Sequence, residues 1–431
     1  MEEPPPPDIL VTAATHKRPR TLSASSSLSA ESLHSTRTLQ NEDLEFVYEN
    51  GRVYGNDSYF MPCDEAEQDR LALQHQIYLL ALKGKLTTTK VSHFTRRILD
   101  LGTGPGHWAV AMAQEYPWAE VVGIDMAVWD IETTEETAGD ADVKWELDDL
   151  DVWGVEDEVD DLTLQLERAH LARDLGNRDP TASPARQRAK TSPSQSTTQP
   201  QTPSESAYDL YVLNPDEQPG WHFSDTYDFI HMRGMKGTFA YWEGVYEEVY
   251  KNLSPDGWIE VVDYHLEVPV IEKEDAESSV VDRDPFPFPT LAQLHLSLLQ
   301  ASVKCGRPIG TYYMHPTYLT DAGFKDVSTT YVNVPVGQWP DDEEQRRIGK
   351  LFLVCVMEML EANVLRLLTT HGDTQRVWPV EEVQEAIEQS KREILEWNTR
   401  MDQRREADGR AGTQKGWEWK ASYKWMTGRK S

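Results

Sequence analysis

The stretch RILDLGTGPGHWAVAMA, residues 97–113, decides the fold class of this chain. It begins with a short apolar strand pattern from Ile98 to Leu101, passes through glycines at 102, 104 and 106, and continues with apolar residues at helical spacing. A tight strand-to-helix turn needs residues that tolerate unusual backbone angles, and a ligand lying against backbone leaves no room for side chains. The stretch therefore predicts a buried strand, a ligand-binding loop and a helix.

The glycine spacing separates two classes of cofactor. A dinucleotide site uses G-x-G-x-x-G, which from Gly102 requires Gly or Ala at a position where this chain has His107. The chain reads instead as D-x-G-x-G-x-G from Asp100 to Gly106. A carboxylate beside the loop suits the sulfonium and ammonium groups of S-adenosylmethionine and would repel a pyrophosphate. The loop therefore favours S-adenosylmethionine over a nicotinamide dinucleotide.

Carboxylates follow the next two strand patterns. Asp125 ends the run AEVVGID, and Asp148 and Asp149 follow the run VKWEL at residues 143–147. Ligands of α/β sheets bind beyond the carboxyl ends of the strands, so these side chains are expected near the glycine loop. There Asp125 can accept the hydroxyl groups of a ribose, and Asp148 or Asp149 an adenine amino group. The alternative is a tight turn with unrelated surface acids.

The rest of the chain alternates between strand and helix patterns. Asp64 with Glu67 fits a capping box at the start of a helix that ends near Lys83. Further helices are expected at residues 242–253, 341–369 and 380–405, a turn at 254–257, and strands at 227–232, 258–263, 323–334 and 422–428. Such alternation indicates an α/β domain around a mostly parallel sheet.

Two segments lack the apolar periodicity of a folded core. Residues 1–40 are rich in Pro, Ser and Thr and predict a disordered N-terminal tail, in which His16–Arg20 is either a nuclear-import signal or a few solvated charges. Residues 155–206 predict a disordered insertion, because strand and helix patterns resume after them. We therefore expect a single domain over residues 41–431, interrupted by this insertion.

The overall charge narrows the classes of partner. The 431 residues include 73 acidic and 42 basic side chains, a formal net charge of -31. Such a surface repels nucleic-acid phosphates and anionic lipid, so neither direct nucleic-acid binding nor membrane binding is expected. The cysteines at 63, 305 and 355 fit neither a metal site nor a disulfide scaffold, and no signal-peptide pattern is present. These features predict a cytoplasmic or nuclear protein without a metal.

Several motifs in order resemble the class I methyltransferases, and within them the fungal LaeA-like group. The similar stretches are YFMPCDEAEQDRLALQH from Tyr59, the glycine loop, AEVVGIDM, YDFIHMR, LSPDGWIE, AGFKDV and TGRK. The resemblance implies a Rossmann-like seven-stranded, mostly parallel sheet with helices on both faces and one reversed strand near the C-terminus. It implies S-adenosylmethionine as cofactor, held by Asp100, Gly102, Thr103, Gly104, Gly106, Asp125, Met126, and Asp148 or Asp149.

The acceptor side is less defined by sequence. His231 and Arg233 follow a strand whose end faces the cofactor in this fold, so His231 is a candidate base and Arg233 a candidate anchor for an anionic acceptor. The alternative is that His231 caps a buried strand and Arg233 pairs with an acid. The resemblance implies methylation of a small secondary metabolite or of a protein. A regulatory interaction protein with little turnover, acting through protein partners, is the competing hypothesis.

Overall fold

The computed structural model describes residues 46–57, 59–129, 141–152, 220–221, 223–266, 288–408 and 418–431, together with four short strands outside these ranges. The basic run 16–20 and the insertion 155–206 lie outside the described residues. Two of the short strands, β1 (Leu10–Thr12) and β2 (Thr36–Thr38), fall within the segment expected to be a disordered tail. The others are β10 (Ile271–Glu272) and β11 (Arg283–Asp284), which form a separate antiparallel pair.

Nine of the described strands form one central sheet, ordered β12-β13-β9-β8-β5-β6-β7-β1-β2. Its seven-stranded core confirms the expected fold class, and β1 and β2 extend one edge. Strand β13 runs antiparallel to both of its neighbours, whereas β9, β8, β5, β6 and β7 are mutually parallel. The core strands are β5 (Arg97–Leu101), β6 (Glu120–Asp125), β7 (Val143–Leu147), β8 (Tyr227–Arg233), β9 (Leu253–Leu266), β12 (Lys325–Pro335) and β13 (Lys420–Arg429).

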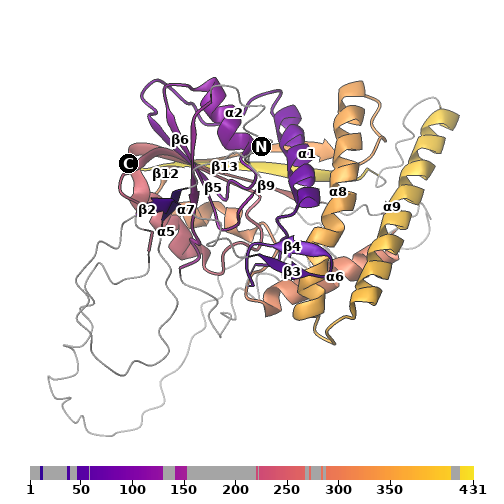
Figure 1. The fold of residues 1–431 in the computed structure, drawn as a ribbon. Coiled ribbons are helices and arrows are strands. Elements are labelled where there is room, and N and C mark those ends of the chain that lie inside the picture. Colours follow the sequence, from indigo (N-terminus) through magenta and orange to yellow (C-terminus); the bar gives the residue numbers. More distant parts are fainter. Residues whose placement is uncertain are drawn as a thin grey trace, which may run out of the picture.

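Helices cover both faces of the sheet (Figure 1). Successive side chains of a strand point to opposite faces of the sheet, so each face can pack against its own helices. Ile98 of β5 and Phe229 of β8 pack with α2, whereas Leu99 and Ile230 pack with α5. The helices are α1 (Glu65–Ala81), α2 (His107–Glu115), α5 (Trp242–Asn252), α6 (Pro289–Lys304), α7 (Pro316–Asp321), α8 (Glu343–Thr370) and α9 (Val380–Asp408), with a short 3-10 turn at Tyr312–Met314. No helix in the described ranges is both long and apolar enough to cross a membrane.

Local signals explain where several of these elements begin. The Asp64 carboxylate accepts the N–H of Glu67 at 3.1 Å, so the predicted cap starts α1. The prediction that a turn at residues 254–257 precedes the next strand is wrong, because β9 already includes these residues. Asp256 within it still adopts a positive φ of 63°, the conformation that the turn pattern indicated.

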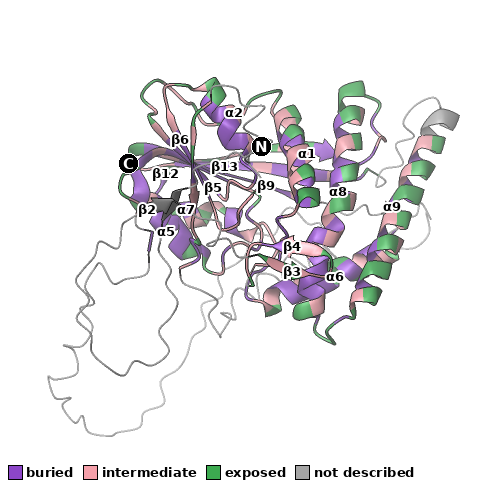
Figure 2. Ribbon diagram, viewed as in Figure 1, coloured by how far each residue is buried: buried purple, intermediate pink, exposed green. Residues whose placement is uncertain are grey.

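Helices α6, α8 and α9 pack against one another, and α8 also packs against β12 (Figure 1). Their facing sides are buried, and α9 presents an exposed face to solvent (Figure 2). Neither α6 nor the hairpin of β3 (Val47–Glu49) and β4 (Arg52–Tyr54) was expected from the sequence pattern. A signal for α6 was present: Pro289 at its first turn precedes Leu291, Leu294 and Leu298 at helical spacing.

Candidate functional site

The glycine loop joins β5 to α2 at the carboxyl edge of the sheet. Gly102, Gly104 and Gly106 have φ of 69°, 56° and 82°, which side-chain-bearing residues rarely adopt. The N–H groups of Gly102 and Thr103 both donate to the Ile124 carbonyl oxygen, at 2.8 and 2.9 Å. The loop is therefore fixed against the end of β6, the strand that carries Asp125.

The glycines at 104 and 106 serve different purposes. A Cβ at Gly104 would approach nothing closer than Leu71 Cδ1 at 3.7 Å, so the space beside it is open and belongs to a cavity. A Cβ at Gly106 would lie 2.7 Å from Cζ3 of the Trp145 ring, and Gly106 does not line that cavity. Gly104 therefore leaves room for a ligand, whereas Gly106 leaves room for a core tryptophan.

Asp125 organises the loop as well as facing the cavity. Its Oδ2 accepts the N–H of Gly104 at 2.8 Å, and its Oδ1 accepts the N–H of Ala127 at 2.9 Å. Burial raises the pKa of this carboxyl, while the two backbone N–H groups act in the opposite direction. Each carboxylate oxygen retains a second acceptor position, so Asp125 can also accept hydroxyl groups from a ligand.

The two consecutive acids after β7 occupy different environments. Asp148 is half-buried and lines the cavity, and burial, followed by the neighbouring Asp149 charge, raises its pKa to about 7. Asp149 is exposed, does not line the cavity, and accepts the N–H of Asp151 at 3.1 Å. The structure therefore places Asp148 at the site and Asp149 in a surface turn.

Asp100 lies at the floor of the cavity and is held from two sides. Thr103 Oγ1 donates to its Oδ2 at 2.8 Å, and His231 Nδ1 lies 2.9 Å from its Oδ1. The His231 ring also stacks on Trp108 at a centroid distance of 3.7 Å. His231 is 1% exposed and does not line the cavity, so it lacks the access to an acceptor that a general base needs. Its contacts are those of a residue that positions Asp100.

Arg233 reaches the cavity, as its place in the sequence predicts. Its Nη1 lies 3.2 Å from His75 Nδ1, and its Cζ lies 4.9 Å from the centre of the Tyr78 ring. Because a guanidinium only donates, the Nδ1 of His75 accepts this hydrogen bond. Arg233 therefore lies between α1 and the sheet, beside the methionyl end expected for the cofactor.

The cavity itself has a volume of about 1120 Å³. At one end it is lined by Asp100, Gly102, Thr103, Gly104, Asp125, Met126 and Asp148. At the other end it is lined by apolar side chains of α6 and α8, including Leu291, Leu294, Leu298, Met359 and Leu360. A site for one small ligand measures roughly 300–1,000 Å³, so this cavity has room for a cofactor and a second molecule.

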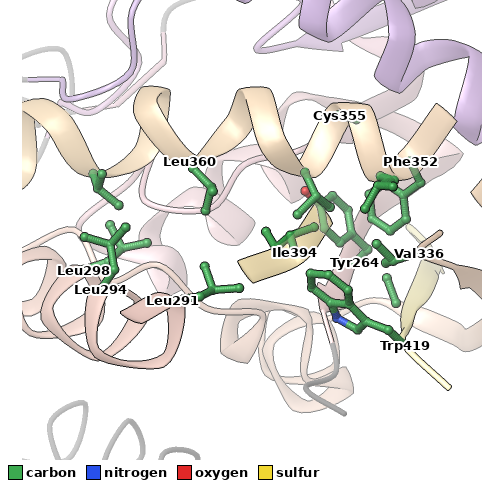
Figure 3. Close-up of a cluster of buried hydrophobic side chains, with 14 of the residues drawn as sticks. Tyr264, Leu291, Leu294, Leu298, Val336, Phe352, Cys355, Leu360, Ile394 and Trp419 are labelled. Carbon is green, nitrogen blue, oxygen red and sulfur yellow. The ribbon is translucent and has the colours of Figure 1, made fainter. Parts of the chain in front are cut away.

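The apolar end of the cavity is the part of the site that the sequence did not reveal. Figure 3 shows Leu291, Leu294 and Leu298 of α6 facing α8, which contributes Leu360, with Tyr264 farther along the same cluster. These leucines also belong to the hydrophobic core, so their spacing resembles that of any buried helix face. Only their place in the lining of the same cavity as the glycine loop identifies them as a binding surface.

The comparisons with known proteins agree with this geometry. The family model described as a methyltransferase domain matches residues 67–301, which is more than half of the chain. The chain therefore belongs to the methyltransferase domain family. Together with the glycine loop and the strand-end carboxylates, this confirms an S-adenosylmethionine-dependent methyltransferase.

Fungal relatives match most of the chain. The secondary metabolism regulator LAE1 of Cochliobolus heterostrophus is 28% identical over 74% of this chain and 81% of its own length. The methyltransferase pytC of Aspergillus terreus is 25% identical, with 78% and 79% covered. The protein-methionine methyltransferase laeA of Emericella nidulans is 24% identical, with 82% and 73% covered. These matches confirm the expected LaeA-like resemblance.

Proposed function

We propose that the polar end of the cavity binds S-adenosylmethionine and that the apolar end binds a small, largely apolar acceptor. Asp125 and Met126 would contact the ribose, Asp148 the adenine amino group, and Asp100 with Gly102, Thr103 and Gly104 the methionyl portion. In this proposal Asp149 and Gly106 shape the site without contacting the cofactor. Methyl transfer is an in-line substitution at an activated methyl group, so the protein mainly provides proximity and orientation.

One observation carries the acceptor proposal: the cavity continues without a break from the glycine loop to the leucines of α6 and α8. A peptide acceptor would present backbone amides that need hydrogen-bond partners, which a leucine wall does not supply. A small apolar molecule loses little on leaving water and gains burial against Leu294 and Leu360. Tyr264 and Lys236 line the same cavity, and Lys236 forms an ion pair with Asp263 at 2.8 Å.

The acceptor proposal is testable by isotope transfer. The purified protein, S-adenosylmethionine labelled in the methyl group, and a fungal extract would be incubated together, then separated into small-molecule and protein fractions. The expected result is label in an apolar small molecule. Label confined to protein would overturn the acceptor class. No transfer to either fraction would favour the regulatory interaction protein instead.

A matched pair of variants links the transfer to the apolar wall. Leu360→Trp should fill the space beside α6 and abolish labelling, while the affinity for S-adenosylhomocysteine stays unchanged because Leu360 of α8 is not among the residues proposed to contact the cofactor. Leu395→Trp makes the same substitution at an exposed position of α9 and should leave both properties unchanged. If Leu360→Trp transferred the labelled methyl group as well as the wild type does, the acceptor would bind outside the leucine-lined part of the cavity.

The remaining expectations from sequence stay proposals. We propose one methyltransferase domain over residues 41–431, supported by β7 and β8, which flank the insertion and belong to the same sheet. We also propose regulatory protein partners and no direct nucleic-acid binding, supported by the net charge of -31 and by relatives named as regulators. A cytoplasmic or nuclear location is supported by three free cysteines.

A further inference from the structure

The backbone of the glycine loop has no hydrogen-bond donor to spare for a carboxylate. Each N–H from residue 102 to residue 106 has a partner within 3.1 Å: Gly102 and Thr103 donate to the Ile124 carbonyl, Gly104 to the Asp125 carboxylate and Gly106 to the Thr103 carbonyl. Pro105 has no N–H. A carboxylate near this loop must therefore find its donors on side chains or on the N–H groups in the first turn of α2, which starts at His107.

The methionyl end of the cofactor carries three charged groups with different needs. Its sulfonium and ammonium groups are attracted by a carboxylate such as that of Asp100. Its own carboxylate requires a cation. The described lining of the cavity contains three arginine or lysine side chains, and two are already paired at 2.6 and 2.8 Å: Arg70 with Glu67, and Lys236 with Asp263.

The third cation is Arg233, and the sheet places it at the start of the loop. Met232 pairs with Leu101 in the register of β8 and β5, so Arg233, the last residue of β8, lies beside Gly102, where the loop begins. The Arg233 charge also contributes, after burial, to lowering the pKa of His107, the first residue of α2. The guanidinium therefore lies between the β5 end and the α2 start.

Burial lowers the pKa of Arg233, and the Asp100 charge acts in the opposite direction without forming an ion pair with the guanidinium. Burial, and then the Arg233 charge itself, lower the pKa of His75 to about 2, so His75 accepts a hydrogen bond as a neutral ring. Burial raises the pKa of Tyr78 well above its usual value, so its ring offers only its π face. Within the described residues, no carboxylate lies within ion-pair distance of Arg233. A half-buried charge in this situation favours binding an anion.

We propose that Arg233 binds the α-carboxylate of the cofactor's methionyl group rather than an anionic acceptor. The proposal rests on the S-adenosylmethionine site proposed above. A guanidinium can form two parallel hydrogen bonds to a carboxylate, which fixes the methionyl chain and hence the direction of the sulfonium methyl group. Arg233 is in this view a residue that orients the cofactor.

The test compares two ligands that differ in one group. S-Adenosylhomocysteine carries the carboxylate, whereas S-adenosyl-3-thiopropylamine keeps the adenosine, the sulfur and the amino group and lacks only the carboxylate. Calorimetric titration would measure both ligands on the full chain and on Arg233→Gln. The variant should bind S-adenosylhomocysteine about 10- to 100-fold more weakly, the range expected for a lost charged hydrogen bond, and the decarboxylated ligand unchanged.

Two further variants complete the experiment. Arg233→Lys keeps the charge and should recover part of the preference for the carboxylate, whereas Lys236→Gln, at the paired cavity lysine, should leave the preference intact. The proposal would be overturned if Arg233→Gln and Arg233→Lys lost affinity for both ligands equally, or if neither variant lost affinity for either ligand. It would also be overturned if only Lys236→Gln lost the preference for the ligand with the carboxylate. If the wild-type chain binds neither ligand, the cofactor site itself is wrong.

Discussion

Replacing Gly104 by aspartate separates the binding role of the glycine loop from its conformational role. The backbone at Gly104 has a φ of 56°, and the direction of an added side chain leads into the cavity beside Asp125. An L-residue in the left-handed region costs about 1–2 kcal/mol, and aspartate is among the residues that tolerate it best. Gly104→Asp should therefore lower the melting temperature by only a few degrees.

The effect on the cofactor should be much larger than the effect on folding. Atoms forced into an occupied, well-packed space cost roughly 1–3 kcal/mol. Two carboxylates about 4 Å apart repel by about 4 kcal/mol at an effective dielectric constant near 20, which opposes any arrangement that keeps Asp125 facing the ligand. Even part of this sum gives a loss of affinity for S-adenosylhomocysteine of about 100-fold, equivalent to roughly 2.7 kcal/mol.

The assay is calorimetric titration with S-adenosylhomocysteine beside a thermal melt of the same sample. Gly84→Asp is the matched control, because Gly84 has a φ of 85°, has nothing within 4 Å of an added Cβ, and does not line the cavity. The control should show a similar shift in melting temperature and wild-type affinity. Gly104→Asp with wild-type affinity would refute the assignment of this loop to the cofactor.

Three other substitutions test individual contacts. Asp125→Ala should weaken S-adenosylhomocysteine binding by about 1.5–3 kcal/mol, and calorimetry showing wild-type affinity would contradict its role. Asp148 has a pKa raised to about 7 because the folded protein favours its protonated carboxyl. The stability that this protonated group allows is present at low pH and is lost as the pH rises from about 4 through 7. The melting temperature of Asp148→Asn relative to wild type should therefore increase over that window, and a constant difference would show that Asp148 is not buried as described. Gly106→Ala should destabilise the protein by about 1–3 kcal/mol through contact with Trp145, and urea denaturation should show a smaller cost in a Trp145→Leu background.

Much of the cofactor end of the site follows from local sequence. The run from Ile98 to Leu101 is a strand because it is apolar and short, and the glycines after it permit positive φ. Asp125 ends β6 and Asp148 follows β7, and parallel strands such as β5, β6 and β7 place their carboxyl ends at one edge of the sheet. These arguments need only periodicity and topology, which is why they succeed without coordinates.

The tertiary structure decided which side chains reach the cavity and which turn away from it. Asp148 and Asp149 are adjacent in sequence, yet only Asp148 lines the cavity. The orientation of such a pair depends on packing against the next loop. His231 carries the residue type of a base, but its strand directs it under Asp100 and against Trp108. Side-chain direction at a strand end is therefore not readable from residue type.

By itself the sequence determined the class of protein: a strand, a glycine loop and strand-end carboxylates that suit one sulfonium cofactor. It did not determine the acceptor wall, because Leu294 of α6 and Leu360 of α8 look like ordinary core residues and are 66 positions apart. Their meeting depends on the long-range packing of α6 against α8. Local periodicity predicts that a helix has an apolar face. Only the tertiary structure shows whether that face packs into the core or lines a cavity.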